Sequence, residues 1–165
     1  MASQGHVIEF NLSAKSVGDP QMLAAVVAAI DFHGADPQNL ICEITETALM
    51  NDVVAAEAFV RGLFDIGCGV ALDDFGAGYG GFSYLKRLPV SYLKIDREFV
   101  HDLAETASSQ HVVAAVVNLA RAFGLKTIAE GAEDDSTLRM LKHLGVDHVQ
   151  GFVLGHPAPA HLILE

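Results

Sequence analysis

Seven polar residues lie within or near the ends of short apolar segments, and their types suit metal chemistry. They are Asn11, Glu43, Asp73, Asp74, Lys94, Glu130 and Gln150. Carboxylate and amide oxygens are the ligands that Mg²⁺ and Mn²⁺ prefer in proteins. Two adjacent aspartates can serve two cations with one oxygen bridging both, an arrangement that cleaves phosphate esters. Lys94 in the same group can hold a phosphate oxygen or the attacking water.

Each of these residues also has an interpretation that needs no ligand. A single carboxylate at a strand end is more often a helix N-cap or a solvated loop charge, and Lys94 alone is equally consistent with a salt bridge to Asp96 or a neighbouring carboxylate. Several such groups in register are harder to explain in this way, because charges in apolar strands are costly to bury without a compensating cation. None of the eight histidines lies at a predicted strand end with a metal-ligand partner at helical spacing, which disfavours a zinc hydrolase.

The elements that must position these residues alternate along the chain. Apolar runs rich in β-branched residues predict strands at 6–13, 40–45, 69–74, 92–96, 126–131 and 148–152. Helical patterns lie between them at 22–34, 52–67, 82–88, 108–124 and 134–145, and several end on glycine. This alternation predicts a parallel α/β sheet, either doubly wound or closed as a barrel, in which the carboxyl ends of the strands bring the polar residues to one face.

Composition narrows the possible partners and the location of the chain. The 165 residues predict a single domain over 1–165, and a formal net charge of −11 argues against binding of long nucleic acid. No stretch has the roughly 20 uninterrupted apolar residues of a membrane-spanning helix. Cys42 and Cys68 are isolated and no export signal opens the sequence, so we expect a cytoplasmic protein without direct membrane insertion.

Several motifs together resemble the EAL domain, a bacterial phosphodiesterase that opens cyclic di-GMP to linear pGpG. They are FNLS, CEITETALM, DDFGAGYGGFSYLKRLPVSYLKIDREFV, TIAEGAE and VQGFVLGHPAP, which occur in the family's order over nearly the whole chain. The resemblance implies a TIM-type (β/α) barrel with one antiparallel strand, of which about six βα units are present here. It also implies cyclic di-GMP as substrate and Mg²⁺ or Mn²⁺, as two ions, in the site.

The resemblance implies a role for each matching residue. Lys94 resembles the residue that positions or activates the hydrolytic water, with Gln150 in support. Gly76 and Gly78 belong to the loop that shapes the metal site and, in many members, the dimer contact; Glu46 resembles the anchor of that loop, and Glu133 a residue that supports the ligands. The implied metal ligands are Asn11, Glu43, Asp73, Asp74 and Glu130, the last also serving in catalysis.

The chain departs from the family pattern in several places. It contains no Glu-Ala-Leu tripeptide, whose glutamate is a metal ligand on a strand before the matching region, and the first strands and helices of the barrel are missing. Gly80 and Gly81 replace small hydroxyl residues, and Gly155 with His156 replaces a common Ser-Arg pair. We therefore expect a homodimer or an N-terminal complementing segment to cover the gap. A catalytically impaired module that binds cyclic di-GMP or a protein partner is the alternative function, and another metal-dependent α/β hydrolase or lyase is a more distant one.

Overall fold

The computed structural model of the chain describes residues 6–75 and 82–159. The strands in these ranges are β1 (Ile8–Leu12), β2 (Leu40–Thr45), β3 (Gly69–Phe75), β4 (Tyr92–Ile95), β5 (Lys126–Glu130) and β6 (His148–Gln150). The α-helices are α1 (Ala14–Val17), α2 (Met22–His33), α3 (Glu46–Asn51), α4 (Val53–Asp65), α5 (Arg97–Val100), α6 (Ala107–Phe123) and α7 (Asp135–Leu144). The short 3₁₀ helices are η2 (Pro37–Asn39) and η3 (Phe82–Lys86).

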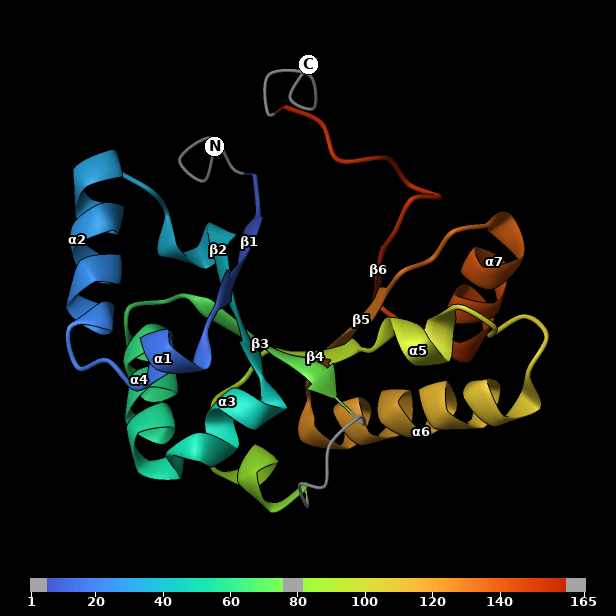
Figure 1. The fold of residues 1–165 in the computed structure, drawn as a ribbon, viewed down its shortest axis with the longest axis horizontal. Helices are drawn as coiled ribbons and strands as arrows, with labels where there is room; N and C mark the ends of the chain where they lie inside the picture. The colour runs from blue at the N-terminus through green and yellow to red at the C-terminus, as the bar shows by residue number, and fades with distance from the viewer. Residues whose placement is uncertain (1–5, 76–81, 160–165) are drawn as a thin grey trace.

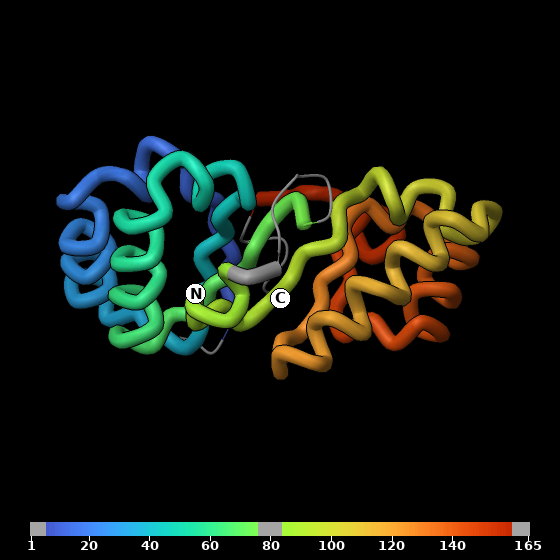
Figure 2. Tube along the Cα trace, turned by 90° about the horizontal axis from the view of Figure 1, so that it is seen from below, coloured from blue at the N-terminus to red at the C-terminus, as the bar shows by residue number. Residues whose placement is uncertain are grey.

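The six described strands form one parallel sheet in the order β1-β2-β3-β4-β5-β6. The sheet curls into a half-barrel, with α2 and α4 at one end and α6 and α7 at the other (Figures 1 and 2). The order follows the chain and never reverses, which excludes the doubly wound alternative and confirms the barrel-type prediction. The antiparallel strand of the family barrel is not among the described strands.

The core lies between the convex face of the sheet and the helices. Its fully buried residues include Leu72 and Leu93 on central strands, Leu63 on α4, Val113 on α6 and Leu141 on α7. Successive strand residues point to opposite faces. Leu72 and Leu93 therefore pack outward into this core, while their neighbours Asp73 and Lys94 are left for the concave face. Among the described helices, none is both long and apolar enough to cross a membrane.

Helix ends follow the sequence signals where those are strong. Gly124 and Gly145 end α6 and α7 in the left-handed conformation, at φ 71° and 80°, as the glycine positions predict. Three short helices directly after strands were not predicted: α1, α3 and α5 begin at the capping residues Ser13, Thr45 and Asp96, whose side chains accept backbone hydrogen bonds. These caps turn the chain away from the sheet at the end where the polar residues gather.

Candidate metal centre

Strand register brings the predicted residues to one end of the concave face. Glu43 is the register partner of Asn11, and Glu130 is the partner of Gln150. The period of two along each strand places the apolar residues Ile41, Tyr92 and Ile128 on the same face, one step towards the amino ends of the strands. They line an open cavity of about 650 Å³ together with residues of both end strands. The concave face therefore has a polar layer at the carboxyl ends of the strands above an apolar layer.

Lys94 occupies the centre of the polar layer. Its side chain is 2% exposed, and its Nζ donates to Glu43 Oε2, pairs with Glu130 Oε1 and lies 3.3 Å from Asp73 Oδ1. Burial alone would lower the pKa of this ammonium, but the hydrogen bonds and charges of the surrounding carboxylates raise it above its ordinary value. Lys94 thus has three acidic neighbours from β2, β3 and β5, and among the described residues it forms no ion pair with Asp96.

The three acids around Lys94 outnumber its single positive charge. One oxygen each of Glu43, Asp73 and Glu130 lie within 4.8 Å of one another, a grouping that can hold a metal ion. Burial raises the pKa of Glu130; Lys94 acts in the opposite direction, and the charges of Asp73 and Glu43 add to the rise. The cluster therefore carries uncompensated negative charge.

Asp73 gives the most specific sign that a cation belongs here. Its Oδ1 is buried and accepts no hydrogen bond within the described part of the chain. A buried carboxylate oxygen without a donor is costly, and a hard divalent cation satisfies such an oxygen. The donor set of three carboxylate groups fits Mg²⁺ or Mn²⁺, so the residues present suit the metal that the family resemblance implies.

Glu9 belongs to the same face, although the sequence analysis did not select it. It lies on β1 two residues before Asn11, and strand periodicity places both side chains on one side. Burial and then the charge of Glu43 raise the pKa of Glu9. The spacing of two from Asn11 was the sequence signal that would have found it.

Asp74 points away from its neighbour Asp73. Its φ of 55° is the only positive value among described residues other than glycine, and the β3–β4 register shifts between Leu72 and Phe75. This irregularity rotates Asp74 out of the cluster. Burial and then the charges of Asp73 and Asp96 raise the pKa of Asp74. The two adjacent aspartates therefore face two places: Asp73 the lysine cluster, and Asp74 the start of α5.

Gln150 lies beside Glu130 because the backbone approaches closely after both strands. A Cβ on Gly151 would lie 2.1 Å from the carbonyl oxygen of Ala132, so only glycine fits there. Gly131, at φ 73°, turns the chain directly after Glu130. Gln150 itself is exposed, as is Asn11 on the opposite end strand, so these two residues flank the cluster without joining its ion pairs.

The remaining predicted residues lie around the cluster. Glu46 is 5% exposed at the start of α3, and burial followed by the charge of Glu46 raises the pKa of Tyr84 on η3. Tyr84 follows closely on residues 76–81, which contain Gly76, Gly78, Gly80 and Gly81 and lie outside the described residues. Glu133 is exposed and lines a cavity of about 230 Å³ with Arg97 and Gln150. Gly155 and His156 are exposed, and the His156 ring lies 4.6 Å from that of Phe152.

Comparison with known proteins matches this arrangement to one family. The EAL domain model matches residues 1–157. The bifunctional diguanylate cyclase/cyclic di-GMP phosphodiesterase MucR of Pseudomonas aeruginosa is 41% identical over 157 residues, which cover 95% of this chain and 23% of MucR. The solved structure of the MucR phosphodiesterase in complex with cyclic di-GMP superposes with a TM-score of 0.91 at 40% identity. The match covers 64% of the solved MucR chain and 96% of this chain.

A second solved structure contains a divalent metal. The Klebsiella pneumoniae protein BlrP1, in complex with calcium and cyclic di-GMP, is 30% identical with a TM-score of 0.82; the match covers 90% of this chain and 38% of BlrP1. The chain thus spans about a quarter of the length of its curated relative MucR and somewhat less than two thirds of the solved MucR chain. With the family model, the half-barrel and the carboxylate cluster in agreement, the chain belongs to the EAL domain family.

Proposed function

We propose that this chain forms the catalytic face of a metal-dependent phosphodiesterase that hydrolyses cyclic di-GMP to linear pGpG. The observation that supports this most is the cluster of three carboxylates around Lys94, with the buried Oδ1 of Asp73 lacking a hydrogen-bond donor. The MucR and BlrP1 structures support cyclic di-GMP as the substrate, because both are complexes with cyclic di-GMP.

The proposed cofactors are Mg²⁺ or Mn²⁺, as two ions. Glu43, Asp73 and Glu130 would hold one ion, with Asn11 beside Glu43, and Asp74 would serve a second. When bound, such ions polarise a phosphate oxygen and lower the pKa of a water. Asp74 suits a separate position because its side chain is exposed and interacts with Asp96 just before α5.

Lys94 would bind and orient the hydrolytic water or a phosphate oxygen. Its ammonium has three N–H donors, and Glu43 and Glu130 fix its position from two sides. With acids on three sides it stays charged at neutral pH, so we assign it hydrogen bonding and charge stabilisation rather than proton abstraction. Gln150, next to Glu130 in register, can contribute an amide group at the same end of the sheet.

The supporting residues act through the loops. Glu46 would anchor the segment that contains Gly76 and Gly78, because it lies against Tyr84, a few residues after that segment. Glu133 would support the site from the loop after β5, where it shares a cavity with Gln150. Both are positioning roles, because the ion pairs of Lys94 are with Glu43, Asp73 and Glu130.

A binding module without turnover is the second candidate function. Gly155 with His156, where the family commonly has a Ser-Arg pair, favours it. A weaker contact to a phosphate or base can slow chemistry while ligand binding persists. Such a module would hold cyclic di-GMP or a protein partner.

One assay distinguishes the two functions. The purified chain is incubated with cyclic di-GMP and Mg²⁺ or Mn²⁺, products are separated by chromatography, and ligand affinity is measured in parallel. We expect pGpG to form only with metal. Lys94→Ala should lower turnover far more than affinity, whereas Lys126→Ala, an exposed lysine at the start of β5, should change neither. Binding without product would establish the module instead, and absence of both would contradict the proposal.

A further inference from the structure

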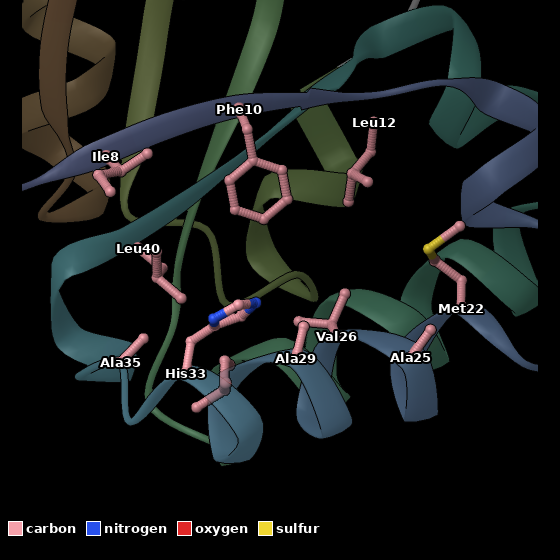
Figure 3. A pocket seen from close by; sticks show the side chains of 11 residues that line it. Ile8, Phe10, Leu12, Met22, Ala25, Val26, Ala29, His33, Ala35 and Leu40 are labelled. Atoms are coloured by element: carbon pink, nitrogen blue, oxygen red, sulfur yellow. The ribbon is translucent and has the colours of Figure 1, made fainter. Parts of the chain in front are cut away.

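Two buried cysteines that are far apart in the sequence meet on the convex side of the sheet. Cys42 lies within β2 and is the register partner of Val70, and Cys68 lies two residues before Val70, directly ahead of β3. Strand periodicity places both side chains on the same side as Leu40, which points into an apolar groove of about 680 Å³ beside α2 (Figure 3). The acids around Lys94 lie on the opposite face, so the thiols are separate from the candidate metal centre.

The two thiols are in direct contact. Cys42 is 0% exposed and Cys68 is 3% exposed, and neither is part of a disulfide. The S–H of Cys42 donates a hydrogen bond to the sulfur of Cys68. This bond lowers the pKa of Cys68, while burial acts in the opposite direction. Because the thiolate is the reactive form of cysteine, the hydrogen bond makes Cys68 the better nucleophile of the two.

Cys68 is also the thiol that lies nearer to solvent and to a bend in the backbone. It directly follows Gly67, which is exposed and turns the chain between α4 and β3 at a φ of 95°. Cys42 instead lies in the middle of a strand, between the buried residues Ile41 and Glu43. A small oxidant therefore reaches Cys68 first, and the backbone beside Cys68 can adjust when a new bond forms.

We propose that Cys42 and Cys68 form a reversible disulfide when a peroxide oxidises the chain, and that this bond acts as a redox switch on the metal centre. The Cys68 thiolate attacks one oxygen of hydrogen peroxide, so that an S–O bond forms, the O–O bond breaks, and hydroxide takes up the Cys68 proton and leaves as water. The Cys42 sulfur then attacks the sulfenic sulfur, so that the S–S bond forms, the S–O bond breaks, and hydroxide leaves with the Cys42 proton as a second water. The two thiols are oxidised to one disulfide, and the peroxide is reduced to water.

The disulfide would reach the metal centre through β2 and β3. Glu43 directly follows Cys42, and its carboxylate pairs with Lys94 on the opposite face of the sheet. Residues that are diagonally offset on neighbouring strands have Cβ atoms farther apart than the roughly 3.8 Å that is usual in a disulfide. The bond must therefore draw the two strands along each other, which changes the spacing between Glu43 on β2 and Asp73 on β3. This coupling rests on the proposed metal centre, whereas the disulfide itself does not.

Treatment of the whole chain with hydrogen peroxide tests both parts of the proposal. Peptide mass mapping without reductant detects a Cys42–Cys68 link, and a dithiol reductant should reverse this link but not methionine sulfoxide, which needs its own reductase. Amide hydrogen exchange follows residues 40–45 and 69–75, and calorimetry measures the Mn²⁺ affinity of the reduced and oxidised chains. We expect a link within one chain, faster exchange in both strands and Mn²⁺ binding weakened by at least about threefold.

A cysteine variant separates the effect of the disulfide from general oxidation. Cys68→Ala keeps Cys42 but removes its partner, so peroxide should cause no change that a dithiol reductant reverses. Its Mn²⁺ affinity should stay within about twofold of the reduced wild-type chain before and after treatment. Cys68→Ser, which keeps the size of the side chain, should give the same result if Cys68→Ala does not fold.

Three results would overturn the proposal. The first is that both thiols stay free in the folded, peroxide-treated wild-type chain. The second is a disulfide that leaves hydrogen exchange in both strands unchanged. The third is an equal, reversible response of Cys68→Ala. Failure of the reduced chain to bind Mn²⁺ would contradict the proposed function instead, and hydrogen exchange would then still decide whether oxidation displaces β2 and β3.

Discussion

Two sets of acidic residues in this chain have opposite surroundings. Aspartates such as Asp52 and Asp134 cap helices, and each accepts a backbone hydrogen bond three residues ahead. Glu43, Asp73 and Glu130 instead share one lysine, and Asp73 Oδ1 accepts no hydrogen bond within the described residues. The capping acids are satisfied by the fold itself, whereas the clustered acids retain excess negative charge that a metal ion could offset. This difference separates helix-capping carboxylates from candidate metal ligands, which look alike in the sequence.

Removal of Lys94, which the clustered acids share, should cause the largest loss of stability. Lys94→Ala leaves three buried or partly buried carboxylates without a cation, and we expect a loss of about 3 kcal/mol in the free energy of unfolding without metal. The pKa of Glu130 is already raised by burial, so the variant should become more stable as the pH falls and this carboxylate is protonated. Urea unfolding at pH 7.5 and 5.5 measures both effects. A variant as stable as wild type at both pH values would show that the clustered carboxylates do not destabilise the fold when Lys94 is absent.

Substitution of Asp74 should weaken metal binding less than substitution of Asp73. Asp74 is exposed and interacts with Asp96, whereas Lys94 pairs with Glu43, Asp73 and Glu130. Asp74→Asn should therefore weaken Mn²⁺ binding by about threefold to tenfold and should act on the weaker of two sites. Paramagnetic titration resolves the two sites. An equal loss at both sites would mean that Asp74 and Asp73 share one ion.

Removal of the Asn11 amide on β1 should have a still smaller effect on Mn²⁺ affinity. Asn11 is exposed and only flanks Glu43, so Asn11→Ala in the isolated chain should weaken Mn²⁺ binding by less than about threefold. The same titration provides the measurement. A loss as large as that caused by a clustered acid would show that β1 is already part of the metal centre.

A capping aspartate should affect stability and leave the metal centre unchanged. Hydrogen bonds from Ser136 and Thr137 hold the pKa of Asp134 at about 2. The carboxylate therefore stabilises the fold above its ordinary pKa near 4, and this contribution is lost as the pH falls towards 2. Asp134→Ala should lower the melting temperature slightly at pH 7 and less at pH 2, with unchanged Mn²⁺ affinity. A change in Mn²⁺ affinity would break the distinction between the two sets.

The sequence predicted the repeating elements well because their signals are local. The strand expected at 40–45 is observed at Leu40–Thr45, and the helix expected at 108–124 is α6, one residue earlier at each end. The pattern alone left doubly wound and barrel folds open, since the two differ in strand order and curvature rather than in periodicity. The sequential order of the six strands resolved that choice.

The details of the site depended on tertiary geometry. Adjacent aspartates look equivalent in sequence, and only the register shift in β3 with its φ of 55° sends Asp74 away from Asp73. The short helix α3 was missed because Thr45, the last residue of β2, is also its cap. Glu9 could have been found from its spacing of two from Asn11 on the same strand. Its raised pKa could not, because burial and the charge of Glu43 on a neighbouring strand depend on tertiary structure.

Calorimetric titration of Mn²⁺ into the wild-type chain, Asp73→Asn and Asp52→Asn tests the central claim most directly. The two variants remove the same charge, and asparagine remains a good helix cap at position 52. We predict that Asp73→Asn weakens binding by at least about tenfold, because it removes the charge of a carboxylate whose buried Oδ1 accepts no hydrogen bond within the described residues, while Asp52→Asn stays within about twofold. Equal Mn²⁺ affinity in all three proteins would contradict the assignment of the cluster as a metal centre.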